Sequence, residues 1–256
     1  MEYKTLLYET RGDIGILTYN RPEMANAMNS LMVEELIHFW QERMADQKTR
    51  VIITTGSGEK GFSSGADLKE TGDLQKDKER MTIDNFFFGQ SRYSFLYRLM
   101  RSCPQPIIAA VNGPALGGGL SLALASDIRL ASEKAWFCAQ YINIGLGGAD
   151  MGSSYFLWRL VGWGKAIEMC LTGMRVSVEE AYRIGLVNHV VPKEDLMARA
   201  MEMATLMASK SRSALYLTKE AFDSALNGIS LEDAIKMENR NQALLMGSLN
   251  TKKQVE

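Results

Sequence analysis

Short apolar runs rich in β-branched residues alternate with helical patterns through the first two thirds of the chain. A hairpin is expected from Leu6 to Tyr19, and buried strands are expected at Val51 to Thr55 and at Ile107 to Asn112. Helical patterns precede each of these buried strands, from Ser30 to Asp46 and from about Met81 to Met100. This alternation is typical of an α/β protein.

The pattern changes from Ser153 onward, where helical segments dominate and only Leu186 to Val191 reads as a strand. At 256 residues the chain is long enough for one large core with an appended element. We therefore expect a core over residues 1–192 and a C-terminal helical region over residues 193–256. A charged stretch from Thr71 to Arg80 is expected to form a mobile loop within the core.

Charge and composition exclude several classes of function. The 29 basic and 30 acidic residues nearly cancel and are scattered, so we expect no nucleic-acid partner and no anionic membrane surface. The apolar runs are too short for a membrane span, and the first residues form no apolar signal segment, which favours a cytoplasmic protein. Three widely spaced cysteines and two histidines favour structural roles over a disulfide frame, a metal site or a catalytic triad.

One short segment imitates a nucleotide-binding turn, because residues 56–61 read G-x-G-x-x-G directly after a predicted strand. A dinucleotide fold would need a helix at these glycines and an acid about 20 residues on, at the end of the next strand. Instead an irregular stretch from Phe62 to Gly65 follows, and residues 75–80 are charged loop. The sequence therefore argues against a nicotinamide cofactor.

Two glycine-rich turns each follow a predicted buried strand. Phe62 to Leu68 ends in a short helix with Asp67 in its first turn, and Asn112 to Gly119 leads directly into a helix. N–H groups at the start of a helix concentrate positive potential, and glycine lets a ligand approach them closely. Either turn alone could be a tight connection, but two such turns can aim two amides at one oxygen, as in an oxyanion hole.

These segments resemble the enoyl-CoA hydratase/isomerase (crotonase) superfamily, and the likeness runs in order along nearly the whole chain. It implies a spiral of repeated ββα units and a C-terminal helical region through which subunits form a homotrimer or, as two trimers, a homohexamer. The residues that carry it are Asn20-Arg21-Pro22 with Asn26-Ala27, Gly61 to Leu68, Ala110 to Gly119, Gly185 to Pro192 and Leu217 to Ala221.

The resemblance also implies a ligand and the residues around it. The ligand is an acyl-coenzyme A thioester, whose carbonyl oxygen is held by the amides of Ala66 and Gly118 while an enolate forms. No metal is expected, and no cofactor beyond the coenzyme A that the substrate carries. The residues expected along the pantetheine and adenine path are Ala25, Ser64, Asp67 and Leu68, with Lys219 reaching a phosphate.

The chain departs from the hydratases of this superfamily at two positions. Those enzymes hold water with two glutamates, and the matching positions here are Ser121 and Tyr141, neither of which is an acid near neutral pH. Asp150 stands nearby, where several isomerase, dehalogenase and hydratase-like branches carry a functional aspartate. Two interpretations of Asp150 remain: a single acid/base, with Ser121 or Tyr141 assisting, or an N-cap of the helix near Ser153.

Three functions are therefore compatible with the sequence. The first is an enoyl-CoA hydratase or isomerase that uses Asp150. The second is a thioester or carbon–carbon hydrolase, in which water attacks the substrate at the same oxyanion hole. The third is a non-catalytic acyl-CoA binding protein that has lost its carboxylates, as Ser121 and Tyr141 indicate. Product analysis separates them, because thioester cleavage releases a free thiol and hydration does not.

Overall fold

The structure, a computed structural model, describes residues 2–70 and 82–253, without the side chains of residues 248–253. Within these residues the large sheet has six strands in the order β1-β2-β3-β4-β6-β9. β1 and β2 form the predicted antiparallel hairpin, and each later pair is parallel. The bounds are β1 Leu6–Arg11, β2 Ile14–Tyr19, β3 Val51–Gly56, β4 Ile107–Val111, β6 Ile128–Ser132 and β9 His189–Val191.

A second, smaller sheet runs beside the first in the order β5-β7-β8 among the described residues. Its strands are β5 Ala115–Leu116, β7 Trp136–Cys138 and β8 Val176–Ser177. The chain passes from β4 to β5 and then a helix, and from β6 to β7 and then further helices, so each of these two turns places one strand in each sheet. The predicted spiral of ββα units is confirmed.

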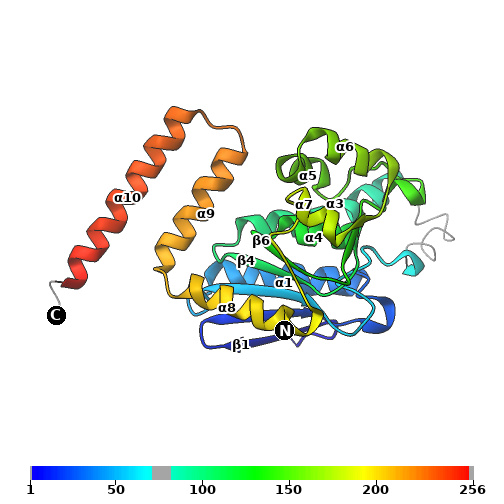
Figure 1. Ribbon diagram of the computed structural model, residues 1–256, viewed down its shortest axis with the longest axis horizontal. Coiled ribbons are helices and arrows are strands. Elements are labelled where there is room, and N and C mark those ends of the chain that lie inside the picture. The colour runs from blue at the N-terminus through cyan, green and yellow to red at the C-terminus, as the bar shows by residue number, and fades with distance from the viewer. Residues whose placement is uncertain (1, 71–81, 254–256) are drawn as a thin grey trace.

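Helices cover both faces of the large sheet (Figure 1). The first begins where Asn29 accepts a hydrogen bond from the Met32 N–H at 3.0 Å, close to its predicted start. The expected mobile loop from Thr71 to Arg80 lies outside the described residues. Bounds are α1 Ser30–Ala45, α3 Ile83–Ser102, α4 Gly118–Ala125, α5 Ser153–Val161, α6 Trp163–Thr172, α7 Val178–Arg183, α8 Leu196–Ala208, α9 Arg212–Leu226 and α10 Leu231–Lys253, with 3-10 turns η1 Pro22–Met24, η2 Ile142–Ile144 and η3 Lys193–Asp195.

The C-terminal helices divide into one that packs on the core and two that extend from it. Leu196, Ala200 and Ala204 of α8 are buried against the face of the large sheet that carries Ile53 and Ile108. α9 and α10 run side by side and project from the core as an arm (Figure 1). The boundary at residue 192 stays a prediction about domains, and by packing α8 belongs with the core. No described helix is long and apolar enough to cross a membrane.

Candidate active site

The two glycine-rich turns pack against each other backbone to backbone. Ser63 N donates to the Pro114 carbonyl at 3.2 Å, and Leu116 N donates to the Ser63 carbonyl at 3.0 Å. A Cβ added to Gly119 would lie 2.1 Å from the Ser63 oxygen, and one added to Gly65 would lie 2.9 Å from the Gly118 nitrogen. Only a chain without side chains at these positions allows such an approach. The structure thus brings the two predicted turns together.

The amides of Ala66 and Gly118 lie next to this contact. Met28 N donates to the Gly65 carbonyl at 2.7 Å and Asp67 N donates to the Met28 carbonyl at 2.9 Å, so the Ala66 N–H points away from Met28. Gly118 is the first residue of α4, where the N–H has no partner within the helix. Neither N–H donates to another atom of the residues that the structure describes. Both are therefore free to donate to a ligand.

Helix α3 supplies three polar side chains that hold the surroundings of these amides. Tyr93 Oη donates to the Met28 carbonyl at 3.1 Å, and Tyr97 Oη donates to the Gly118 carbonyl at 3.0 Å and lies 3.3 Å from Met151 Sδ. One turn earlier, Gln90 Nε2 lies 2.5 Å from an oxygen of Asp150. Spacings of three and four residues put these side chains on one helix face. α3 therefore contacts the second turn at Gly118 and the candidate acid, and it reaches the first turn through Met28, which bonds to Gly65 and Asp67.

Asp150 is half-buried beside this cluster. Its Oδ1 accepts from Gln90 and, at 2.6 Å, from the backbone N–H of Met151. Burial raises the pKa of the Asp150 carboxyl, and the two donors only partly offset that effect. The N-cap of α5 is Gly152, without a side-chain cap bond, so the interpretation of Asp150 as the side-chain cap of this helix is wrong. A carboxyl with a raised pKa is suited to giving and taking protons.

Ser121 and Tyr141, which stand at the positions of the hydratase glutamates, contact each other. Ser121 Oγ lies 2.9 Å from Tyr141 Oη, and both side chains are buried. Burial raises the pKa of Tyr141 above its usual range, and the charge of Asp150 adds to this, so the phenol stays neutral near pH 7. The pair can donate and accept hydrogen bonds, but it cannot act as a carboxylate.

Comparison with known proteins decides the family. A family model described as enoyl-CoA hydratase/isomerase matches residues 9–256. The chain belongs to the enoyl-CoA hydratase/isomerase family. It is 42% identical over 238 residues to a protein of Mycobacterium bovis named a probable enoyl-CoA hydratase, and the match covers 93% of this chain and 83% of that protein. The chain is thus a member of a family of enzymes.

Solved structures of the family have the same fold. An enoyl-CoA hydratase from Bacillus anthracis matches with a TM-score of 0.88 and 32% identity, over 98% of this chain and 97% of that one. A monofunctional enoyl CoA isomerase from M. smegmatis matches with a TM-score of 0.73 and 37% identity, over 90% of this chain and 98% of that one. The chain therefore has the crotonase fold, and relatives carry the names of both reactions.

The residues expected along the coenzyme A path lie in the connected segments before and after β3. Ser64 N donates to the Ala25 carbonyl at 3.0 Å, and Ala25 has a left-handed backbone with φ of 50°. Asp67 forms an ion pair with Arg21 at 2.9 Å. Burial alone would raise the pKa of Asp67, but the hydrogen bond and charge of Arg21, with two backbone amides, hold it below its usual value. Leu68 is 53% exposed and open to a ligand.

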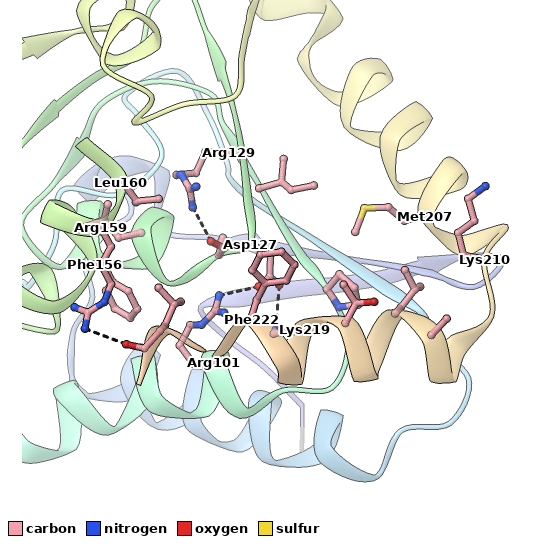
Figure 2. A pocket seen from close by; sticks show the side chains of 18 residues that line it. Arg101, Asp127, Arg129, Phe156, Arg159, Leu160, Met207, Lys210, Lys219 and Phe222 are labelled. Atoms are coloured by element: carbon pink, nitrogen blue, oxygen red, sulfur yellow. Dashed lines mark hydrogen bonds and ion pairs between the residues drawn. The ribbon is translucent and has the colours of Figure 1, made fainter. Parts of the chain in front are cut away.

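Lys219 lies apart from the other residues that were predicted to contact coenzyme A. Lys219 is a residue of α9, and its side chain is buried between this helix and the core. Its Nζ lies 3.0 Å from Asp127 and donates to the Gln105 carbonyl at 3.1 Å. Figure 2 shows it beside Arg101, which also pairs with Asp127, in the wall of a cavity of about 630 Å³ between the arm and the core. The ammonium is engaged inside the chain, so its position gives no support to the predicted phosphate contact.

Sequence reasoning missed several residues that the structure brings to this site. Arg21 belongs to the motif that carries the family resemblance, but its ion pair with Asp67 was not predicted. Gln90 was not predicted to take part, although it stands at helical spacing from Tyr93 and Tyr97. That spacing was the available signal. The spacing alone does not show that Gln90 contacts Asp150, so it did not indicate a proton-transfer site.

Proposed function

We propose that this protein shifts the carbon–carbon double bond of an enoyl-CoA, with Asp150 as its single acid/base. The observation that supports this best is chemical: one carboxyl with a raised pKa adjoins Met151, whose Sδ would lie 3.0 Å from a Cβ added to Gly118, while a neutral Ser121–Tyr141 pair replaces the hydratase glutamates. Moving one proton between two carbons needs one group that can both take and give it. Holding and activating a water molecule is commonly shared between two carboxylates in this family.

The proposed reaction has two proton transfers. Asp150 takes a proton from a carbon next to the double bond, and the electrons of that C–H bond move through the conjugated system onto the thioester oxygen. The amides of Ala66 and Gly118 hold the resulting enolate, each contributing about 3 kcal/mol of transition-state stabilisation. The proton then returns from Asp150 to the other end of the enolate system, which forms the new C–H bond and moves the double bond.

Asp67 is the other acid near the proposed ligand path, and it is unsuited to this role. Its ion pair with Arg21 holds its pKa low, so the carboxylate stays charged and retains its partner near neutral pH. We propose that Arg21 and Asp67 instead fix the segment that carries Ala25, Ser64 and Leu68 along the coenzyme A path. The acid/base chemistry then belongs to Asp150 alone.

Hydration is the second candidate, because relatives such as the one from Mycobacterium bovis are named hydratases. In that reaction Asp150 would take a proton from water while the hydroxyls of Ser121 and Tyr141 orient it. The two hydroxyls lie 2.9 Å apart, so each uses one of its hydrogen-bonding positions on the other. This arrangement leaves less capacity for water than two carboxylates would provide.

The test is the variant Asp150→Asn on a panel of enoyl-CoA thioesters with the double bond at different positions. Loss of an acid/base typically lowers turnover by about 10²- to 10⁴-fold, and a loss of that size is expected here. The matched control is Asp195→Asn, because Asp195 is exposed and makes no side-chain cap bond. Turnover of Asp150→Asn close to that of the control would contradict the proposal.

Products sort the remaining alternatives in the same assay. Isomerisation changes the position of the double bond without change in mass. Hydration adds the mass of water and removes the conjugation of the thioester. Release of free thiol would instead identify a thioester hydrolase, and a shortened or ring-opened acid would identify carbon–carbon cleavage. Tight binding without any turnover would identify a non-catalytic acyl-CoA binding protein.

We also propose that the arm formed by α9 and α10 joins copies of this chain as a homotrimer or homohexamer. In the single chain the arm leaves large apolar side chains open to solvent, including Phe222 at 69% and Leu231 at 78% exposure. Apolar groups exposed together on one element are typical of a surface that packs against another protein. Analytical ultracentrifugation at micromolar concentration should find a trimer or hexamer, and a monomer would contradict this.

A further inference from the structure

The two oxygens of the Asp150 carboxyl have different surroundings. Oδ1 accepts two N–H donors, from Gln90 at 2.5 Å and from Met151 at 2.6 Å. Oδ2 accepts none from the residues that the structure describes. An oxygen that accepts two N–H groups has both lone pairs engaged and is a poor site for a proton. The proton of the neutral acid therefore belongs on Oδ2.

The position of Gln90 is fixed by the helix that carries it. Tyr93 and Tyr97 lie three and seven residues further along α3, and their hydroxyls bind the carbonyls of Met28 and Gly118. These two bonds set the rotation and the axial position of α3 against the glycine-rich turns. The same face then carries Gln90 to Asp150. The second donor is equally fixed, because Met151 has a left-handed backbone with φ of 48°.

We infer that Gln90 is a positioning residue for proton transfer: it holds Asp150 Oδ1, so that Oδ2 is the atom that exchanges protons with the substrate. This inference rests on the proposed function, since it assigns a role within the same reaction. Gln90 itself does not contact the reacting carbons. Its amide keeps the carboxyl from rotating and stabilises the charged form of Asp150, since a hydrogen bond to a carboxylate favours that form.

The neighbours of Asp150 leave its titration simple. The titratable groups that interact with it are Tyr97 of α3 and Tyr141 before η2, and Tyr141 in turn interacts with Cys170 of α6. Burial raises the pKa of all three, so they stay neutral in the acid range. No charged side chain of the described residues lowers the pKa of Asp150. The fall of kcat/KM at acid pH, the acid limb of its pH profile, therefore reports the pKa of Asp150 as set by its two donors.

The test compares two substitutions with opposite expected effects. Gln90→Met keeps a similar length but removes the donor, so the charged form of Asp150 is less favoured and the acid limb of kcat/KM should move up by about one pH unit. Gln90→Lys replaces the amide by a cation, so the limb should move down. The same two shifts are expected in a ¹³C NMR titration of the Asp150 carboxyl, which needs no turnover.

Matched variants separate the possible outcomes. Gln41→Met, on the exposed face of α1, should leave both the limb and the NMR titration unchanged. A Gln90→Met enzyme that loses activity equally at every pH, with an unmoved Asp150 titration, would overturn the positioning role. If Gln90→Met is unstable, Gln90→Lys tests the positioning role instead: a downward shift of the Asp150 titration supports the role, and an upward or absent shift contradicts it. Active Asp150→Asn protein would refute the proposed function itself, whatever the variants at Gln90 do.

Discussion

The glycine-rich turns of the site and the anchor of the C-terminal arm are held together by different forces. The turns meet through backbone hydrogen bonds and through contacts so close that Gly119 has no room for a Cβ against Ser63. The anchor depends on charge: Asp127 pairs with Arg101 at 2.7 Å and with Lys219 at 3.0 Å (Figure 2). Arg101 also pairs with Asp223. One region excludes side chains, and the other is built from them.

This difference determines how each region responds to change. Backbone contacts carry no net charge, so they are insensitive to pH, but they tolerate no added atom. The ion pairs of Asp127 line a cavity of about 630 Å³, so neighbouring side chains have room to move. A buried ion pair is nevertheless lost when one partner loses its charge, and the remaining charge destabilises the fold. The site is therefore rigid where an enolate oxygen would be held, while the arm is attached through groups that can be tested one charge at a time.

The largest loss of stability is expected from Asp127→Asn. Lys219, whose side chain is only 6% exposed, would then lose its charged partner, and the backbone N–H of Ile107 would lose a carboxylate acceptor. Breaking a buried ion pair by removing one partner costs about 3–5 kcal/mol. Urea unfolding at a fixed protein concentration measures this. The matched control Asp195→Asn should change the free energy of unfolding by less than about 0.5 kcal/mol.

The same variant should also lose part of the acid sensitivity of the protein. Burial alone would raise the pKa of Asp127, but the charges of Lys219 and Arg101 and the Ile107 amide hold it below its ordinary value. The stabilisation that the Asp127 carboxylate gives to the folded state is therefore complete above about pH 4. It is lost as the pH falls through the lowered pKa. The difference in free energy of unfolding between wild type and Asp127→Asn should therefore become smaller below that pH. A gap independent of pH would show that Asp127 acts without its charge.

Much of the core was predictable because its elements carry local signals. The hairpin, α1 and the strands β3 and β4 follow the β-branched runs and helical spacings of the sequence, and each lies within a few residues of its expected position. The glycine run that includes Gly118 and Gly119 was predicted to join a buried strand to a helix, and it opens α4 as expected. Local sequence was sufficient where the structure depends on backbone conformation.

The parts that were not predictable depend on side chains far apart in the sequence. Lys219 and Asp127 are 92 positions apart, and Gln90 and Asp150 are 60 apart, so no local pattern joins them. The expected phosphate role of Lys219 came from family resemblance, which does not show which way a side chain points. The helix-cap interpretation of Asp150 was reasonable for its residue type and was wrong because Gln90 and Met151 engage the carboxylate instead.

A smaller loss is expected from Gly119→Ala, which tests the region held by backbone contacts. The added Cβ would lie 2.1 Å from the Ser63 carbonyl oxygen, a backbone atom that cannot rotate away, so the two turns must separate. Such overpacking costs about 1–3 kcal/mol, and the upper end is expected here. Gly147→Ala is the control, because its Cβ would meet no atom within 4 Å. Equal unfolding midpoints for the two variants would show that the turns are not tightly packed.

The smallest effect is expected from Tyr141→Phe, which removes one hydroxyl from the neutral pair and leaves Ser121 Oγ buried without it. Loss of a buried hydrogen bond should cost about 1 kcal/mol in urea unfolding, whereas the control Tyr182→Phe, at a 58% exposed position, should cost almost nothing. If isomerisation uses Asp150 alone, turnover should fall less than tenfold, equivalent to less than about 1.4 kcal/mol of barrier. A larger loss confined to hydration would instead assign the pair to orienting water, because only that reaction needs a held water molecule.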